Sequence, residues 1–505
     1  MLAQVHSFVL EGIDPVSCEV EVDIAEGGMA TPTTVVGLPD AAVKESIERV
    51  HSAISNSGYP FPSARKLVNL APADIRKEGP IFDLPIAVGF LLAQNVIQTF
   101  AHRRLLFAGE LALDGQLRPV NGIINLALLA RRRKMRGIVV PEENAAEAAA
   151  VGNIEVYPAA TLASVVAHLN DEIPLEPHAG VDVDEMLSDA AAEVDFGDVR
   201  GQEAAKRAAT VAAAGGHNLL MVGPQGTGKT LMSKAIPGIL PPLSRDEALE
   251  VTRLYSIVGQ LPRGEPLMTR RPVRTPHHTS SNVALIGGGS VPRPGEVSLS
   301  HHGVLFLDEM AEFPRIVLET LRQPMEDARV TIARAHSSLE YPARFMLVGA
   351  LNPTAKGRTS EDEAGQREMQ RYLSRLSGPL IDRIDIHVEV SPVPYRQLTS
   401  NARGTDTATM RRRVVTARGR QSRRNGGPTR CNSTLSGREL DRLAPFDKPG
   451  RALLKQAMSE LGLSARAYDK IRRVARTISD LEGRDDVQAE DVAEAIQYRL
   501  LDRQM

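Results

Sequence analysis

The 505-residue sequence predicts an α/β protein of several domains, with a parallel sheet at its centre and helices at its end. Two apolar runs without polar alternation, Leu219–Val222 and Val304–Leu307, are typical of strands covered on both faces. A glycine-rich loop follows the first run, and two acidic residues follow the second. Beyond residue 393, apolar residues recur at helical spacing, which predicts a helical C-terminal part.

The glycine-rich loop fills every fixed position of the P-loop pattern. Its residues are Gly223, Pro224, Gln225, Gly226, Thr227, Gly228, Lys229 and Thr230. In such a loop the backbone N–H groups face the β-phosphate, Lys229 reaches the β- and γ-phosphates, and the Thr230 hydroxyl ligates Mg²⁺. The N-terminus of the following helix adds positive potential. The sequence therefore predicts a site for ATP and Mg²⁺.

Two acids follow the second predicted strand and complete this site. Asp308 and Glu309 lie directly after Leu307, at the carboxyl end of that strand. Open parallel sheets bind ligands at this edge. We expect Asp308 to hold Mg²⁺ through water and Glu309 to act as the general base that polarises the attacking water. The alternative is that the two acids cap the start of a helix.

A third apolar run, residues 345–351, ends at Asn352. A polar residue at that strand tip would lie between Asp308 and the γ-phosphate. Asn352 is therefore predicted to orient the lytic water, the sensor role in ATPases of the AAA+ kind. The alternative is a turn former, which is common for Asn before Pro.

The chain resembles the magnesium-chelatase-like AAA+ proteins of the YifB/ComM group along nearly its whole length. The motifs that carry this resemblance are GLPD at 37–40, KES at 44–46, KEGP at 77–80, FDLPIA at 82–87, RTPHHT at 274–279, ALIGGG at 284–289 and AIQYR at 495–499. The resemblance implies a homo-hexameric ring with ATP sites at subunit interfaces. ComM members of the group are implicated in DNA branch migration during natural transformation.

The same resemblance implies roles for two arginines. Arg383, within a stretch similar to "LLDRxD", is the candidate arginine finger that would project into a neighbouring subunit's site. A salt bridge with Asp382 or Asp385 is the alternative, and Arg375 is a weaker finger candidate. Arg466 resembles the second sensor, an arginine that would touch the γ-phosphate from a helical lid.

Four parts are predicted along the chain. Residues 1–169 resemble the Lon-protease fold, a ribosomal-S5-like α/β domain. Residues 170–195 read as a linker, residues 196–392 as the AAA+ core and residues 393–505 as a helical lid. Peptidase activity is not expected, because Ile81 and Ile124 occupy the positions of the Ser nucleophile and the Lys of Lon.

The lid contains one strongly patterned helix. Ile471, Val474, Ala475 and Ile478 fall on one predicted buried stripe. The basic residues of the same helix are expected to face elsewhere; they are Lys470, Arg472, Arg473 and Arg476. Ser464 is the predicted N-cap.

Composition says more about where the protein is located than about which partners it binds. The net charge of −2 gives no argument for nucleic acid from overall charge. Cys18 and Cys431 lack disulfide or metal-ligand spacing, which fits a reducing cytoplasm. Residues 1–10 carry no signal-peptide pattern, and no apolar stretch is long enough to predict a membrane span.

A DNA partner has to bind through local basic residues. One candidate insert contains Arg270, Arg271, Arg274, His277 and His278, and a second hairpin at 328–348 carries Arg329 and Arg334. Solvated charged loops are the alternative. The adjacent histidines here and at 301–302 lack the spacing of a zinc site.

The strongest basic cluster is the arginine run between Arg411 and Arg424. It fits a nucleic-acid arm, a solvated helix face or an intersubunit contact equally. Two functions stay open at this point. One is a ring ATPase that moves single-stranded or branched DNA, and the other is a chelatase-like or chaperone-like ATPase that remodels a protein partner.

Overall fold

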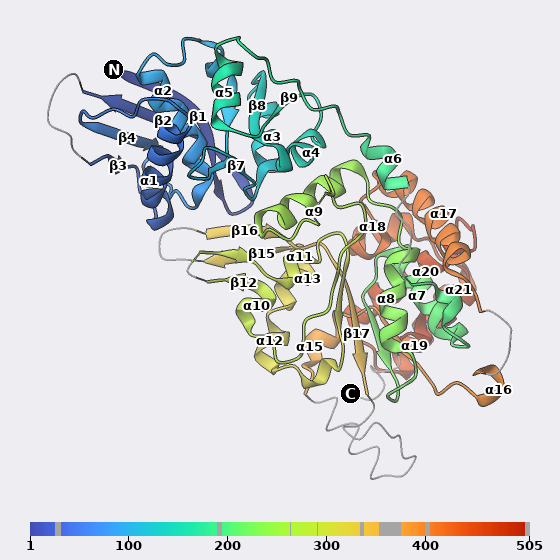
Figure 1. Cartoon of the computed structure of the whole chain (residues 1–505). Helices are drawn as coiled ribbons and strands as arrows, with labels where there is room; N and C mark the ends of the chain where they lie inside the picture. The colour runs from blue at the N-terminus through green and yellow to red at the C-terminus, as the bar shows by residue number, and fades with distance from the viewer. Residues whose placement is uncertain are drawn as a thin grey trace. The chain divides into compact units, whose positions relative to one another are not determined.

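The computed structural model of the chain describes residues 1–25, 32–188, 194–262, 264–289, 291–333, 338–352, 375–398 and 404–499. It divides into two compact units (Figure 1). The first unit contains Met1–Leu187 and Ser244–Thr269, and the second contains Ser188–Leu243 and Arg270–Met505. In the described part of the chain, no helix has the length and apolar character needed to cross a membrane.

The first unit contains a mixed seven-stranded sheet in the order β3-β4-β2-β1-β5-β8-β9. The strands are β1 Leu2–Glu11, β2 Asp14–Ile24, β3 Thr34–Val36, β4 Lys66–Ala71, β5 Leu105–Phe107, β8 Gly137–Pro141 and β9 Glu155–Ala159. β1, β2 and β4 pair antiparallel, whereas β5, β8 and β9 pair parallel. A small hairpin of β6 Glu110–Leu111 and β7 Leu117–Arg118 turns at Gly115, whose φ is 86°.

The helices of the first unit are α1 Ala41–Asn56, α2 Asp83–Ala93, α3 Ile123–Arg132, α4 Glu142–Ala149, α5 Leu162–Leu169 and α9 Arg245–Ile257. α2 is apolar on nearly all sides because it is buried in the core beside β1 and β2. Its one acid, Asp83, is fully buried and is paired with Arg49 of α1, with Nε and Oδ2 2.8 Å apart.

Helix α9 packs with the first unit although the sequence places it between two elements of the second. Arg253 of α9 donates to Asn125 Oδ1 at 2.8 Å and to Asp14 Oδ1 at 2.9 Å. The hydroxyl of Ser256 accepts from the Gly122 amide at 2.8 Å and donates to the buried Glu147 carboxyl. The chain therefore leaves the second unit after Leu243 and returns to it at Arg270.

The second unit contains the predicted parallel sheet, which the structure confirms as five strands in the order β11-β14-β17-β10-β18. The strands are β10 Leu219–Val222, β11 Val273–Arg274, β14 Val304–Leu307, β17 Met346–Leu351 and β18 Ile386–Glu389. Leu219 and Met221 pack into one core, and Leu220 and Val222 pack into another. Both faces are covered, which explains why the strand sequences show no polar alternation.

Helices cover both faces of this sheet (Figure 1). One face bears α7 Glu203–Gly215 and α8 Lys229–Ile239. The other bears α10 Asn282–Ile286, α12 Arg315–Glu319 and α15 Gly378–Ile381. Further short elements among the described residues of this unit are α11 Glu296–Leu299, α13 Arg322–Asp327, α16 Tyr395–Leu398, β12 Gly287–Gly288, β13 Arg293–Pro294, β15 Arg329–Ala333 and β16 Ser338–Pro342. Helix α6, Val183–Ser188, lies almost wholly in the first unit.

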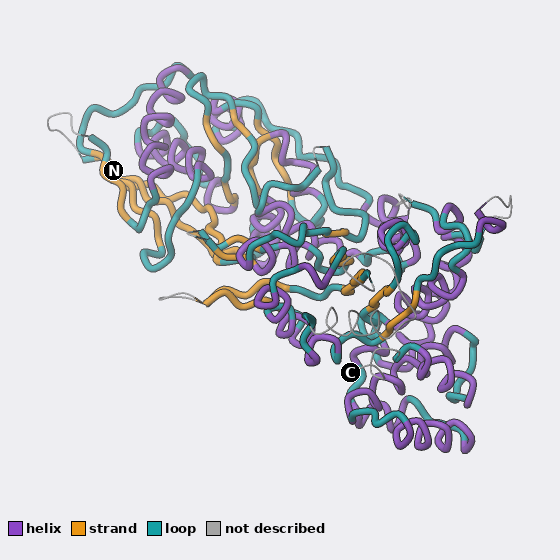
Figure 2. The backbone as a smooth tube through the Cα atoms, turned by 90° about the horizontal axis from the view of Figure 1, so that it is seen from below, coloured by secondary structure: helices purple, strands orange, loops and turns teal. Residues whose placement is uncertain are grey.

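The C-terminal part is helical, as predicted (Figure 2). Its helices are α17 Thr407–Asn425, α18 Gly437–Leu443, α19 Lys448–Glu460, α20 Ala465–Leu481 and α21 Ala489–Gln497. The predicted stripe of α20 is buried, and the Ser464 hydroxyl caps the helix by accepting from the Ala467 amide.

The expectation that the basic residues of α20 face away from the core was wrong for three of them. Lys470, Arg472 and Arg476 are also buried. Arg476 is fully buried and pairs with Asp480 one turn later, so a second face of the helix packs against the unit through ion pairs. The spacing of apolar residues did not reveal this second face.

Candidate active site

The P-loop lies between the end of β10 and the start of α8. Gly226 and Gly228 have φ values of 78° and 89°, a region that glycine enters without strain. Thr227 Oγ1 donates to the Pro224 carbonyl at 2.9 Å and holds the turn closed. A Cβ on Gly226 or Gly228 would meet nothing within 4 Å, so the loop presents open backbone on this side. This geometry fits the phosphate cradle that the sequence predicts.

Gly223 is required for a different reason, which gives a testable prediction. A Cβ at this position would lie 2.1 Å from the carbonyl oxygen of Val390, the residue after β18, and backbone atoms there cannot move aside as a flexible side chain can. We expect Gly223→Ala to destabilise the protein by about 1–3 kcal/mol, the usual cost of overpacking. Gly419→Ala on α17 is the matched control, because its Cβ meets nothing within 4 Å. Urea unfolding measures both variants, and equal midpoints would contradict the prediction.

Lys229 begins α8 and its side chain lies in the loop. The residue is 7% exposed, and its Nζ donates to the carbonyl oxygens of Gly223 at 2.6 Å and Pro224 at 2.7 Å. A third bond of 3.2 Å reaches Asn352 Oδ1 at the end of β17. Burial lowers the pKa of the Lys229 ammonium, and the Asp308 and Glu309 carboxylates oppose that shift. The positive charge is thus held where the P-loop pattern requires it.

Thr230 and Asp308 form the candidate metal site. Thr230 Oγ1 donates to Asp308 Oδ2 at 2.8 Å, although the two residues come from α8 and from the end of β14. Hydroxyl and carboxylate oxygens are the hard ligands that suit Mg²⁺, which usually keeps several waters and takes few protein ligands. The pair of residues therefore fits the predicted ion.

Glu309 follows Asp308 in a backbone conformation that few non-glycine residues adopt, with φ of 48°. Its Oε1 accepts from Asn352 Nδ2 at 3.4 Å and from Gln225 Nε2 at 3.5 Å. Strained backbone of this kind is common where a side chain must point at a ligand. The Glu309 carboxylate lies between the P-loop and the tip of β17.

The structure thus brings together Lys229, Thr230, Asp308, Glu309 and Asn352. The strand order explains why: β14, β17 and β10 are neighbours, and they run parallel, so their carboxyl ends meet at one edge. The reading of Asp308 and Glu309 as a helix cap receives no support, since neither side chain caps the short 3₁₀ turn that follows.

Arg383 does not join this group. Its side chain, 13% exposed, donates to the Pro379 carbonyl at 2.7 Å and pairs with Glu326 of α13. It lines a cavity of about 470 Å³ together with Glu319 and Arg322. The alternative of a salt bridge with Asp382 or Asp385 was wrong, because both acids have other cationic partners.

The ion pair of Arg466 is likewise made with a residue outside the P-loop group. It is 66% exposed in the first turn of α20, and its Nη1 is 3.2 Å from Asp382 Oδ2. Arg375, the weaker finger candidate, donates to both carboxylate oxygens of Glu312 at 2.9 and 3.0 Å. Two partner residues were not predicted from the sequence: Glu326, which pairs with Arg383, and Lys470, which pairs with Asp385. Only Lys470 could have been suspected, since it lies four residues after Arg466 and hence on the same helix face.

Several basic residues proposed for nucleic acid have internal partners instead. Arg274 lies in edge strand β11 and pairs with Glu296, with contacts of 2.5 and 2.7 Å. Arg271 donates to the backbone carbonyl oxygens of Pro241, Pro242 and His302. His277 is exposed and its ring stacks on His278 at 4.1 Å.

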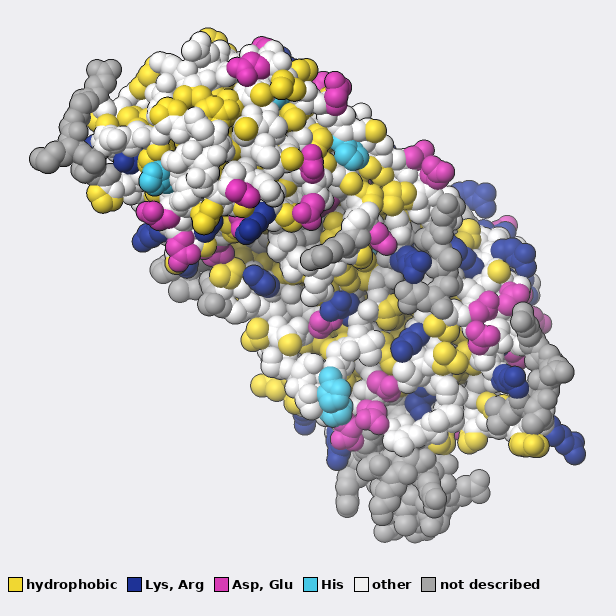
Figure 3. Space-filling view, in the orientation of Figure 1, with side chains coloured by type: hydrophobic (Ala, Val, Ile, Leu, Met, Phe, Trp, Pro, Cys, Tyr) yellow, Lys and Arg dark blue, Asp and Glu magenta, His cyan; other side chains and the backbone are white. Residues whose placement is uncertain are grey.

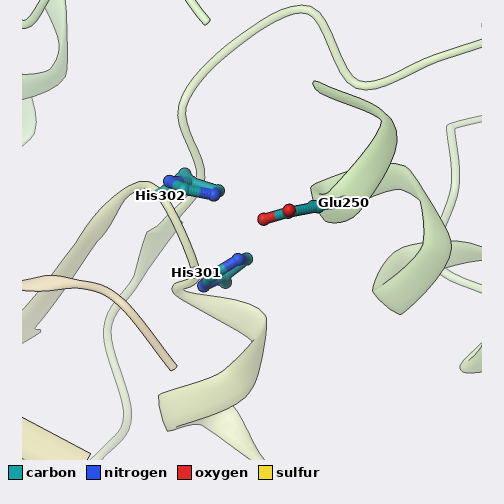
Figure 4. A group of neighbouring side chains, drawn as sticks. All are labelled: Glu250, His301 and His302. Carbon is teal, nitrogen blue, oxygen red and sulfur yellow. The ribbon is translucent and has the colours of Figure 1, made fainter. Parts of the chain in front are cut away.

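The second hairpin and the other histidine pair contain the remaining basic residues considered in the sequence. Arg329 of β15 pairs with Glu340 of β16 at 3.3 Å, and Arg334 lies outside the described residues. His301 and His302, before β14, lie with ring centroids 4.0 Å apart (Figure 4), and the His301 ring accepts from the Arg344 amide at 2.9 Å.

The arginine run of α17 is also largely engaged within the unit. Its ion pairs join Arg413 to Glu482, Arg420 to Asp485 and Arg424 to Asp480. On the face shown in Figure 3, basic side chains are interspersed with acidic ones. The pairings of α17 favour a structural use of this cluster over a nucleic-acid arm.

The model of magnesium chelatase, subunit ChlI, matches residues 195–398, and the models of the ChlI subunit and of its C-terminal part match residues 20–144 and 404–499. The chain is 24% identical over 304 residues to the magnesium-chelatase subunit ChlI of Chlorella vulgaris, covering 55% of this chain and 79% of that protein.

Two bacterial relatives align along the whole chain. The uncharacterised protein YifB of Salmonella typhimurium is 41% identical over 505 residues, and the competence protein ComM of Haemophilus influenzae is 41% identical over 507 residues. Each alignment covers 99% of this chain and 98% of the relative. The chain therefore belongs to the magnesium-chelatase-like family of ATPases that contains YifB and ComM.

Proposed function

We propose that this ATPase hydrolyses ATP with Mg²⁺ as part of an oligomeric ring and converts hydrolysis into movement of DNA, as a branch-migration or helicase-like motor. The observation that carries the hydrolytic part is the meeting of Lys229, Thr230, Asp308, Glu309 and Asn352 at one sheet edge. These groups supply a phosphate-binding cation, two oxygen ligands, a general base and an amide that orients water.

The chemistry follows from where these groups lie. Lys229 would hold the β- and γ-phosphates, and Thr230 and Asp308 would hold Mg²⁺, which would supply positive charge to the phosphate oxygens. Glu309 accepts a proton from the attacking water. Asn352 donates to Glu309 and accepts from Lys229, so its amide fixes the carboxylate relative to the phosphate end of the site.

The ring is supported by the position of Arg383. Its contacts are with α13 and α15, and none of them involves the P-loop of the same chain. An arginine finger placed this way serves a neighbouring subunit, as the hexameric arrangement implied by the family requires. Arg466 is proposed to act from the lid as the second sensor, once the contact with Asp382 is released.

DNA is proposed as the partner because a full-length relative is named a competence protein. The β15–β16 hairpin and the exposed His277 are the candidate contacts in the described residues. A cytoplasmic location belongs to the same proposal, since both cysteines are free thiols. The N-terminal domain is proposed to serve assembly or binding rather than peptide hydrolysis.

The test is the ATPase rate without DNA, with single-stranded DNA and with branched DNA. We expect both DNAs to stimulate hydrolysis, and DNA affinity to fall steeply with rising salt because phosphate contacts release counterions. Heparin is the control, since it is a polyanion without bases. No stimulation by either DNA would favour the alternative, a chelatase-like or chaperone-like ATPase acting on a protein partner.

A further inference from the structure

The short segment from Asp382 to Asp385, which carries Arg383, is held by the C-terminal helical domain through several polar contacts. Arg466, in the first turn of α20, pairs with Asp382 at 3.2 Å. One turn later, Lys470 donates to the Ile384 carbonyl at 3.1 Å and pairs with Asp385 at 3.5 Å. The segment is therefore bound at each of its residues other than Arg383, namely Asp382, Ile384 and Asp385.

Asp385 is the deepest of these anchors. The residue is 7% exposed, and its carboxylate also accepts from the amide of Asn218, just before strand β10, at 3.0 Å. Burial raises the pKa of the Asp385 carboxyl, but the Lys470 ammonium, His217 and that amide together hold the pKa below its usual range. Arg499, after α21, adds a 2.6 Å bond to the Ile384 carbonyl.

The segment makes contacts with two different parts of the unit. Asp382, Ile384 and Asp385 are engaged by residues of the C-terminal helices, whereas Arg383 pairs with Glu326 of α13 beside the cavity. Arg466 and Lys470 are four residues apart, so they occupy the same face of α20. Displacement of α20 would pull on the residues that flank Arg383 on both sides.

We propose that α20 positions Arg383 through the Lys470–Asp385 and Arg466–Asp382 pairs, so that the lid of one subunit sets the arginine finger offered to its neighbour. This inference rests on the proposed ring ATPase. Lys470, Asp385 and Asp382 are positioning residues, because they act on the neighbouring site only through Arg383. The cause is local: both pairs fasten the residues on either side of the finger to α20.

The experiment uses mixed full-length subunits. Acceptor subunits carry Arg383→Ala and keep their own P-loop, and donor subunits carry Lys229→Ala and keep Arg383. We expect the mixture to recover ATPase activity, and donors that also carry Asp385→Asn and Lys470→Met to recover at least about 10-fold less, since small displacements of a catalytic group cost up to about a hundredfold. In these mixtures kcat should fall while the KM for ATP stays the same.

The matched control donor carries Arg424→Met and Asp480→Asn. This removes the pair between Arg424 of α17 and Asp480 of α20, whose Nη1 and Oδ1 atoms are 2.6 Å apart, together with the Arg476–Asp480 pair. Neither pair touches the Arg383 segment. The control should recover as much activity as the unaltered donor. Equal recovery by the Asp385→Asn/Lys470→Met donor would overturn the inference, whereas no recovery in any mixture would contradict the finger in trans itself.

Stability is checked by thermal unfolding of each donor. If the Asp385→Asn/Lys470→Met donor does not fold, the donor that carries Asp382→Asn tests the inference instead. This change breaks only the pair with the exposed Arg466 and leaves the buried Lys470–Asp385 pair intact. Reduced recovery by the Asp382→Asn donor supports positioning by α20. Full recovery by that donor counts against it.

Discussion

Replacing Glu309 with Gln is expected to stop ATP hydrolysis while ATP binding is retained. As the proposed general base, Glu309 must accept a proton, and an amide cannot do so; general bases contribute about 10²–10⁴-fold to rate. Gln keeps the shape and the oxygen that accepts from Asn352 Nδ2. Lys229, the proposed phosphate-binding cation, is untouched.

Single-turnover hydrolysis and the binding of a fluorescent ATP analogue measure the two effects separately. Glu312→Gln is the matched control, since this acid lies three residues later and pairs with Arg375 rather than facing the P-loop. Lys229→Ala should differ from both variants by losing nucleotide binding as well. Hydrolysis at the normal rate in Glu309→Gln would show that the base has been assigned to the wrong residue.

The second large effect is expected from Arg383→Ala. An arginine finger contributes about 10³–10⁵-fold to phosphoryl transfer, because its guanidinium binds charge that spreads over the transferring group. A ring made only of Arg383→Ala subunits should therefore bind ATP and hydrolyse it very slowly. Mixing these subunits with Lys229→Ala subunits should restore part of the rate, because some interfaces then contain one intact P-loop and one intact finger.

Arg375→Ala is the control for this prediction. Arg375 is the weaker finger candidate, and its guanidinium is paired with both oxygens of Glu312 on the protein surface. Its loss should change the ATPase rate much less than the loss of Arg383. A larger effect of Arg375→Ala, rescued in trans by Lys229→Ala subunits, would transfer the finger to that residue.

The candidate site was largely predictable from the sequence. Asp308 with Glu309, and Asn352, follow short apolar runs directly, and Lys229 and Thr230 end the glycine-rich loop after a third run. Such runs predict buried strands because both faces of the sheet are covered. Parallel strands then place the residues after Leu307 and Leu351 at the same edge as the P-loop. The sequence could not give the strand order, which puts β17 between β14 and β10 and so places Asn352 between Lys229 and Glu309.

The partners of the arginines were not predictable. Arg383 has two acids within two residues, yet it pairs with Glu326, because the adjacent acids point at α20. Lys470 was expected to face away from the core, since the apolar stripe of α20 defines only one buried face. A cation is buried on a second face only where an acid from elsewhere meets it, and the acid here lies in another element of the chain.

By itself, the sequence determined the family, the parallel sheet, the P-loop and the helical C-terminus, because each depends on local patterns of apolar, glycine and acidic residues. Three facts were decided by the tertiary structure alone. The Arg383 side chain contacts Pro379 and Glu326 and not the P-loop group of the same chain, the segment around it is fastened to α20, and α9 packs with the first unit. These facts depend on charges and hydroxyls such as Asp385 with Lys470 and Glu147 with Ser256, which are far apart in sequence. Such pairs form only when folding brings their elements together, because a buried charge or polar group is stable only beside a partner.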